Sequence, residues 1–387
     1  MDFSLCQPVV KPLDLVVGGL VDPEELVGRT RELTEIQNGV TTALGVVLVG
    51  DRRMGKTSVL RKLEATWAEA GHDVIFVSAQ TVNASTFAGR LMERLTPMTW
   101  FARERKRWTL DIDVSYKGLR LRRTGGKAPE PEIDLLAWAA ERAAPKTLIV
   151  MIDELPVLLG AMSPTKAEAE EFMNSLRAAR QEHTNLIVVL AGSIGLHHVL
   201  PPGSGHVNDL QTQALGPLDP CSALGLALGL LERLEADCHR REFAEAVVTA
   251  TDAIPYYIQW SIQQTSLDQD WRRDPLDRLR AAMADPLDPL DFRHYIARIP
   301  GYYGPQAAIV YRMLDAYATS DGLTIAELDE RLRRDAGGGV PRRQDLVELV
   351  FRLQRDHYLV PSPHSKDRFA SRLLATAWRI MRRLDDE

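Results

Sequence analysis

The stretch GDRRMGKT at residues 50–57 decides the fold of this chain. It follows GVVLV at 45–49, an apolar and β-branched run typical of a buried parallel strand, and precedes SVLRKLEATWAEA at 58–70, which has helical spacing. The stretch reads Gly, four residues, Gly-Lys-Thr, and between a strand and a helix this spacing indicates a phosphate-binding loop. The alternative is a glycine-rich strand-to-helix turn with an incidental lysine.

The residue types of the loop match the chemistry of phosphate binding. Gly50 and Gly55 let backbone N–H groups curl around phosphate oxygens without a Cβ in the way. Lys56 brings a positive charge to the β and γ phosphates, the Thr57 hydroxyl is a ligand for Mg²⁺, and the helix N-terminus adds its partial positive charge. We therefore predict that ATP or ADP is bound with Mg²⁺ by Gly50, Asp51, Arg52, Arg53, Met54, Gly55, Lys56, Thr57 and Ser58.

The composition is that of a globular chain without polycationic character. Its 387 residues predict about two or three domains, and the hydrophobic fraction of 45% is ample for a core. Because the formal net charge is −6, contact with nucleic acid would need a local basic patch.

The termini and cysteines bear on the compartment. MDFSLCQPVVKPLDL at the N-terminus lacks a basic region followed by a long apolar stretch, and no run approaches about 18 apolar residues. We therefore expect no signal peptide, no membrane span and a cytoplasmic location. Cys6, Cys221 and Cys238 are scattered without metal-ligand spacing, from which we expect a reducing compartment and no disulfide framework.

Further strand and helix patterns alternate after the loop. Apolar runs occur at 72–80, 147–154 and 185–193, and helical patterns occur at 86–95, 132–143 and 166–182. This alternation predicts an α/β fold, a P-loop NTPase parallel sheet with helices on both faces. Residues 108–116 alternate strictly and GLRLRR returns after Lys117-Gly118, which predicts a β-hairpin within a basic insertion at about 103–127.

The strand run TLIVMIDE ends on Asp153-Glu154. An ionised pair there would be costly to desolvate without a cation nearby. We predict that Asp153 holds Mg²⁺ opposite Thr57 and that Glu154 is the catalytic base for the attacking water, with an acidic helix N-cap as the alternative.

Two other residues are weaker candidates. Ser193 ends the run NLIVVLAGS, where its hydroxyl would touch the γ-phosphate or the attacking water, or would simply close a strand. Arg29, just upstream of the first strand, would contact the base or phosphates, or would be a surface arginine beside a helix start. Arg52 and Arg53 are expected to point to solvent or to a neighbouring subunit.

The chain changes character after LGPLDP at 215–220. The preceding part comprises an extended lead-in, 1–26, and the ATPase core, 27–217. Residues 218–298 read almost wholly as helix and are predicted to form a lid. Residues 299–387 follow the order helix, helix, helix, strand pair, which is the order of a winged helix.

At this point the chain resembles a known family. LVGRTREL, GDRRMGKTS, TLIVMIDELPVLL, LIVVLAGS, LGPLDP and TDAIPYYIQ stand in the order seen in the archaeal-type ATPases of the signal-transduction ATPases with numerous domains, close to the AAA+ group. The resemblance covers about residues 20–385 and implies a switch with a lid, a winged helix and Pro255 near the nucleotide. Where the family has Gly before this proline, the chain has Ala253-Ile254-Pro255.

The resemblance also raises the question of an arginine finger. GLHHVLPPGSGHVND after Ser193 contains no arginine. If hydrolysis needs a finger, it comes from Arg177, from Arg180, or from a partner protein or second copy of the chain.

Nucleic-acid binding has two candidate regions. Residues 103–127 hold nine Lys or Arg against three acidic residues, with Trp108 and Tyr116 interleaved; the alternative is a solvated hairpin packed on the sheet. Residues 301–387 hold 14 basic and 13 acidic residues, which is poor for a DNA-binding face, so DNA is not favoured. The sequence thus predicts an ATP-binding and ATP-hydrolysing switch. The alternatives are a DNA-engaging ATPase of transposition, repair or defence and a nucleotide-loaded scaffold with negligible turnover.

Overall fold

The computed structural model describes residues 1–80, 84–95, 120–121, 133–162, 167–192, 195–200, 205–334, 341–362 and 366–384. They form two compact units. One consists of residues 20–216, and the other combines residues 1–19 with 217–387. The chain therefore passes between the units twice, at 19–20 and at 216–217. We call them the nucleotide unit and the lid unit.

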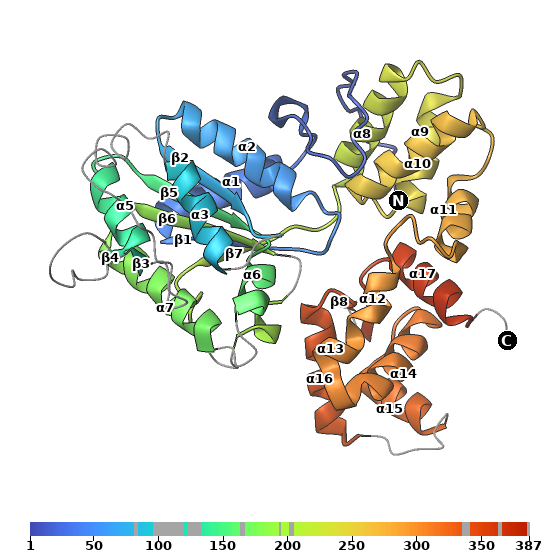
Figure 1. The fold of residues 1–387 in the computed structure, drawn as a ribbon. Coiled ribbons are helices and arrows are strands. Elements are labelled where there is room, and N and C mark those ends of the chain that lie inside the picture. Colours follow the sequence, from blue (N-terminus) through green and yellow to red (C-terminus); the bar gives the residue numbers. More distant parts are fainter. Residues whose placement is uncertain are drawn as a thin grey trace, which may run out of the picture. The chain divides into compact units, whose positions relative to one another are not determined.

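The nucleotide unit is built on a five-stranded parallel sheet (Figure 1). Its strand order, β2-β5-β6-β1-β7, places the loop-bearing β1 between β6 and β7. The strands are β1 (Gly45–Val49), β2 (Asp73–Ser78), β5 (Leu148–Asp153), β6 (Leu186–Gly192) and β7 (Gln211–Ala214). This confirms the predicted fold class.

Both faces of the sheet are buried, which explains the continuous apolar runs. Alternate residues such as Ile75, Val150 and Val188 pack with one set of helices, α3 (Ala84–Leu95), α5 (Leu135–Ala143), α6 (Leu155–Met162) and α7 (Ala167–Glu182). The opposite face is covered by α1 (Thr30–Thr42) and α2 (Lys56–Glu69), where the Arg61 guanidinium lies 3.7 Å from the centre of the Phe76 ring. The two helix layers lie on opposite sides of the sheet in Figure 1.

Two local features of this unit differ from the sequence analysis. Strand β7, QTQA, was not predicted, because a polar edge strand shows no apolar run. The strand pair formed by β3 (Arg120–Leu121) with β4 (Ile133–Asp134) is antiparallel. The predicted helix at 132–143 therefore begins only at Leu135, after Asp134 has capped it. Of the predicted basic insertion at about 103–127, only Arg120 and Leu121 lie within the described residues, so its predicted hairpin is not tested.

Two helices of the lid unit, α8 (Pro220–Arg233) and α11 (Pro275–Ala284), begin at an Asp-Pro pair in which the aspartate caps the helix. Asp219 Oδ1 accepts hydrogen bonds from the Cys221 and Ser222 backbone nitrogens at 3.1 and 3.0 Å, and proline occupies the next position, where the missing N–H costs nothing. Asp274 and Pro275 repeat the arrangement. The other helices of this part are α9 (Arg240–Ala250), α10 (Pro255–Asp268) and α12 (Arg293–Ala297).

In the C-terminal part of the lid unit, the three predicted helices are α14 (Ala307–Ala318), α15 (Ile325–Arg334) and α16 (Arg343–Arg355), which an antiparallel strand pair follows; the short α13 (Ile299–Tyr303), which was not predicted, precedes them. Leu323 also bridges to Asp367 through two backbone hydrogen bonds of 2.9 Å, which adds a third strand position that the sequence analysis did not foresee. The other elements are β8 (Leu359–Ser362), β9 (Lys366–Phe369) and α17 (Arg372–Arg382).

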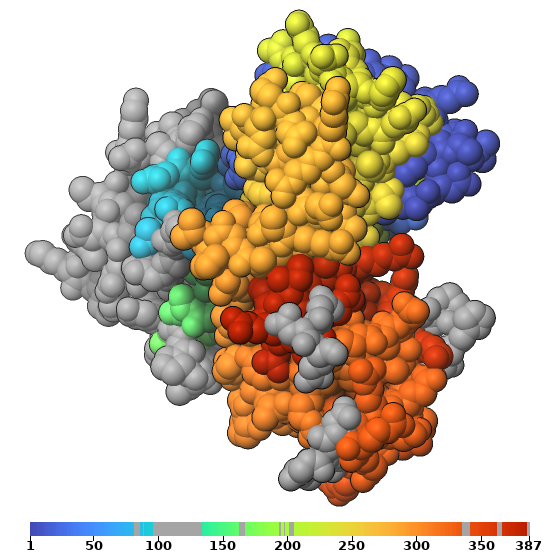
Figure 2. Space-filling view, turned by 90° about the vertical axis from the view of Figure 1, so that its right-hand side faces the viewer, coloured from blue at the N-terminus to red at the C-terminus, as the bar shows by residue number. Residues whose placement is uncertain are grey.

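The N-terminal segment packs against the lid helices, beside which it is drawn in dark blue in Figure 2. Cys6 is disulfide-bonded to Cys221 across 215 residues of sequence, and Phe3 and Leu13 are buried nearby in the same unit. The expectation of no disulfide is therefore wrong for this pair, and the inference of a reducing compartment loses its basis. Only the fold brings these two cysteines together, so their spacing gave no signal.

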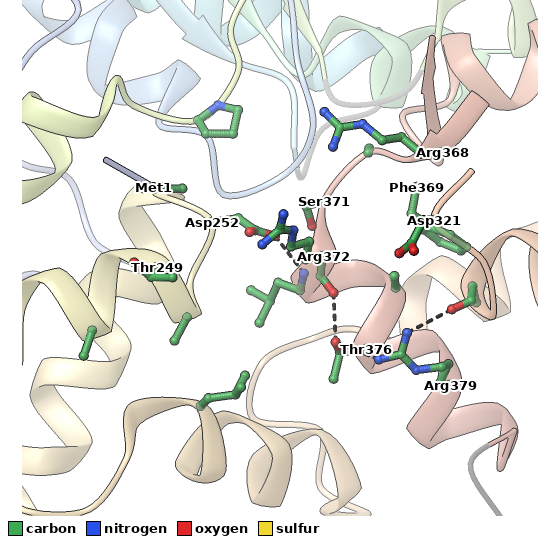
Figure 3. Close-up of a pocket in the computed structure, with 18 of the residues that line it drawn as sticks. Met1, Thr249, Asp252, Asp321, Arg368, Phe369, Ser371, Arg372, Thr376 and Arg379 are labelled. Atoms are coloured by element: carbon green, nitrogen blue, oxygen red, sulfur yellow. Dashed lines mark hydrogen bonds between the residues drawn. The ribbon is translucent and has the colours of Figure 1, made fainter. Parts of the chain in front are cut away.

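The turn between α9 and α10 passes through two left-handed residues before the proline. Asp252 and Ala253 have φ of 50° and 58°, in the left-handed region that L-residues with a Cβ adopt at a cost. Pro255 then opens α10 at its first position. Asp252 Oδ2 accepts a 2.7 Å hydrogen bond from the Leu373 backbone nitrogen, so this turn caps α17 (Figure 3).

We predict that Asp252→Ala lowers the free energy of unfolding by about 1 kcal/mol, because the Leu373 backbone N–H in the first turn of α17 loses its acceptor while Ser371 still caps the helix. Asp252→Asn keeps an oxygen acceptor without the charge. Burial raises the pKa of Asp252, so the carboxyl stabilises the fold most below its unfolded pKa, and this contribution is lost as pH rises through the folded pKa. Urea unfolding should show the Asn variant gaining stability relative to the parent as the pH rises from about 4. Equal, pH-independent losses in both variants would contradict this role.

Candidate functional site

The loop at residues 50–55 connects β1 directly to α2 and takes its shape from two glycines. A Cβ at Gly50 would lie 2.4 Å from the backbone oxygen of Leu215, so only glycine fits where these segments pass. Gly55 has φ of 85° and turns the chain into α2. Arg53 is also left-handed, at φ of 70°. Two left-handed residues close together leave the loop backbone curled at the N-terminus of a helix.

Lys56 lies inside this curl and is only 6% exposed. Its Nζ donates to the backbone oxygens of Gly50 and Asp51 at 2.9 and 2.8 Å. Burial lowers the pKa of Lys56, and the nearby negative charges of Glu154, Asp51 and Asp153 act in the opposite direction. The loop therefore holds a buried ammonium beside the predicted phosphate position.

Asp153 ends β5 and is 3% exposed. Its Oδ2 accepts a 2.7 Å hydrogen bond from the Thr57 hydroxyl, joining residues 96 positions apart in the sequence. Burial raises the pKa of Asp153, and the Thr57 hydrogen bond partly offsets this. The two residues predicted to hold Mg²⁺ are therefore in direct contact.

Glu154 follows in an unusual backbone conformation. Its φ is 55°, and its backbone nitrogen donates to Asp153 Oδ1 at 3.0 Å. Left-handed non-glycine residues cost of order 1–3 kcal/mol and cluster at functional sites. Its backbone oxygen accepts a 3.0 Å bond from Val157 in the first turn of α6, so the turn joins β5 to α6 and sets Glu154 beside Asp153.

The other loop residues have distinct surroundings. Asp51 and Met54 are buried, and Asp51 Oδ1 accepts a 2.8 Å bond from the Arg52 backbone nitrogen. Arg52 and Arg53 are half-buried rather than fully solvent-exposed. Ser58 is half-buried in the first turn of α2.

Arg29 lies beside this loop and is 4% exposed, so the alternative of a surface arginine is wrong. Its Nη2 donates to the backbone oxygens of Met54 at 2.9 Å and Gly216 at 2.7 Å, and its Nη1 pairs with Glu32 at 3.0 Å. Arg29 thus binds the protein backbone at the loop. Contact with a nucleotide stays a prediction.

Two further predicted residues do not belong to the described part of the nucleotide unit. Ser193 lies outside the described residues, and Pro255 belongs to the lid unit. A cavity of about 1220 Å³ lies within the lid unit, and Figure 3 shows Arg368, Arg372 and Arg379 among its lining residues. None of the predicted site residues lines it.

Arg180 does not fit the role of an arginine finger. It is fully buried, its Nη2 donates to Asp209 at 2.7 Å, and it also bonds the His206 backbone oxygen. Arg177 is half-buried and donates to the Gly205 backbone oxygen at 3.0 Å. If the Arg180 guanidinium moved away, the half-buried Asp209 carboxylate would lose its ion pair.

Solved structures with the same fold are known. A Walker-type ATPase of Pyrococcus abyssi is 18% identical, with a TM-score of 0.64 over 97% of this chain and 99% of that one. This chain has a P-loop NTPase fold. The ORC2 protein of Aeropyrum pernix is also similar in its ADP form (14% identity, TM-score 0.47, 96% and 97% covered) and in its ADPNP-ADP complexes (12%, 0.49, 94% and 98%). No protein-family model and no curated protein matches the sequence.

The residues at the loop of this P-loop NTPase fold suit a nucleotide with Mg²⁺. The curled backbone and the buried Lys56 provide donors for phosphate oxygens, while Thr57 and Asp153 provide oxygen ligands of the kind Mg²⁺ takes. Within the described residues, no cluster of three or more His, Cys, Asp or Glu offers another metal site. None of the described helices is both long and apolar enough to span a membrane.

Proposed function

We propose that this protein is a Mg²⁺-dependent ATP-binding and ATP-hydrolysing switch of the signal-transduction type, related to AAA+ ATPases. The observation that carries this proposal is the 2.7 Å contact between the Thr57 hydroxyl and Asp153 Oδ2 beside the buried Lys56. It joins the first turn of α2, which follows the phosphate-binding loop, to the carboxyl end of β5. A nucleoside triphosphate and its metal require such an arrangement.

Lys56 and the loop amides would bind the phosphates. A phosphate oxygen is a stronger acceptor for the Lys56 ammonium than the carbonyls of Gly50 and Asp51 that hold it now. The charge of the nucleotide would also offset the burial that lowers the pKa of Lys56. The N-terminus of α2 adds favourable backbone dipoles at the same place.

Thr57 and Asp153 would hold Mg²⁺, which when bound neutralises the negative charge of the phosphates. A cation there would favour the ionised form of Asp153, whose burial now disfavours it. Glu154 lies one residue further along the chain, where its carboxylate would accept the proton of the attacking water. Ser193, which follows β6 in the sequence, is proposed to orient that water.

An arginine finger, if used, is proposed to come from a partner protein or from a second copy of this chain. Arg180 and Arg177 are held by Asp209 and by the Gly205 backbone oxygen. A charge supplied in trans would make turnover depend on assembly.

The switch is proposed to act through the lid unit. Lid residues 218–298 and the proposed winged helix, 299–387, belong to one compact unit, which favours their moving together when Pro255 and its neighbours respond to ATP. ATP can shift this arrangement only if it binds one conformation better than another.

We predict that Lys56→Ala weakens ATP binding at least ~10-fold, about 1.4 kcal/mol, because the buried ammonium beside the phosphates is lost. Lys62→Ala on the same helix is the control, since Lys62 pairs with Glu24 and should leave affinity unchanged. Isothermal titration calorimetry gives both values. Equal affinity for the Lys56 variant and the parent would remove the phosphate-loop assignment.

We predict that Glu154→Gln binds ATP like the parent but hydrolyses it at least ~100-fold more slowly, because the amide cannot accept the proton. Phosphate release measures turnover, with Glu64→Gln on α2 as the control. Undiminished turnover would mean that Glu154 only caps α6. A parent that binds ATP without turnover would favour a nucleotide-loaded scaffold.

A further inference from the structure

Arg29 joins two segments that are far apart in the sequence. Its Nη2 donates to the backbone oxygen of Met54, 25 residues away, and to that of Gly216, 187 residues away. The side chain is 2% exposed, and its Nη1 is held by Glu32. Arg29 itself caps α1 with φ of 65°, so both its backbone and its guanidinium are fixed.

The two acceptors have different positions in the molecule. Met54 lies in the phosphate-binding loop, between the left-handed residues Arg53 and Gly55. Gly216 is the last residue of the nucleotide unit before the chain enters the lid unit. Its neighbour Leu215 donates to the Val49 backbone oxygen at 2.7 Å. Residues 215–216 therefore lie against the loop at its start and are tied to its end by Arg29.

We propose that Arg29 is a positioning residue that couples the conformation of the phosphate-binding loop to the chain junction at 216–217. This rests on the proposed function, since it requires phosphate to occupy the loop. A bound phosphate would accept hydrogen bonds from the loop N–H groups, and we expect this to shift the Met54 carbonyl, which lies between Arg53 and Gly55. Because one nitrogen atom bonds both carbonyls, a displacement of Met54 is passed to Gly216 or breaks one of the two bonds. Either result changes the junction.

This role differs from direct contact with the nucleotide. The guanidinium is buried and its bonds to Met54, Gly216 and Glu32 would have to be given up for Arg29 to reach a ligand. The proposed role also differs from a purely structural one. If Arg29 only stabilised the fold, nucleotide binding would not change amide exchange at residues 215–218 through it. The two alternatives make different predictions for affinity and for amide exchange.

The test combines Arg29→Met, which removes both backbone bonds at similar length, with Glu32→Gln, which removes the ion-pair charge and leaves both. Hydrogen exchange is followed with and without Mg²⁺–ATP, and calorimetry gives affinity. In the parent and Glu32→Gln, ATP should change exchange at residues 50–57 and at Leu215, Gly216 and Leu218. In Arg29→Met, affinity should stay within about tenfold of the parent and the change at 50–57 should persist. The change at 215–218 should be lost.

Three outcomes would overturn the proposal. The first is a parent that binds ATP without altered exchange at 215–218. The second is an Arg29→Met variant that keeps the altered exchange. The third is a variant that melts like the parent but loses ATP binding as Lys56→Ala does, which would make Arg29 a nucleotide ligand. If Arg29→Met does not fold, Arg29→Lys retains the charge without the planar fork and should weaken the junction response. A parent that binds no nucleotide would instead refute the proposed function.

Discussion

The burial of three charged side chains where β1 and β5 end is the constraint on which the site depends. Lys56, Asp153 and Arg29 are 6%, 3% and 4% exposed. Removing such groups from water costs several kcal/mol per ion, and buried ion pairs rarely recover this as net stability. Here the cost is offset by the loop's own carbonyls, by the Thr57 hydroxyl and by Glu32. For Lys56 and Asp153, whose pKa values burial shifts against their charged forms, the proposed nucleotide and Mg²⁺ would supply compensating charge.

The fold and the centre of the site could be predicted because their signals are local. A parallel strand buried on both faces is apolar along its whole length, so β1, β2, β5 and β6 were visible as runs. The loop motif has fixed spacing, and its strand and helix flanks specify its context. Asp153 was found because a carboxylate at the end of such a strand needs a partner.

The remaining features depend on contacts between distant segments. The disulfide between Cys6 and Cys221 has no spacing signal, and β7 is polar because only part of it is buried. The sequence left open whether Arg29 is a surface residue, because its hydrogen bonds to Met54 and Gly216 depend on the fold. Arg180 was a candidate arginine finger because of its charge. Its complete burial and its hydrogen bond to Asp209 depend on the fold and have no sequence signal. The left-handed backbone of Ala253 was not predicted, because an alanine gives no sequence signal for a positive φ.

The most direct test of a Mg²⁺-dependent nucleotide site is the binding of ATP to the parent protein, cleared of bound nucleotide, with and without MgCl₂. Calorimetry would report both affinities. The account predicts that ATP binds and that Mg²⁺ tightens the binding by tenfold or more, which is about 1.4 kcal/mol, because Thr57 and Asp153 add ligands to the metal. No binding of ATP or ADP at millimolar concentration, or an affinity that Mg²⁺ leaves unchanged, would contradict it.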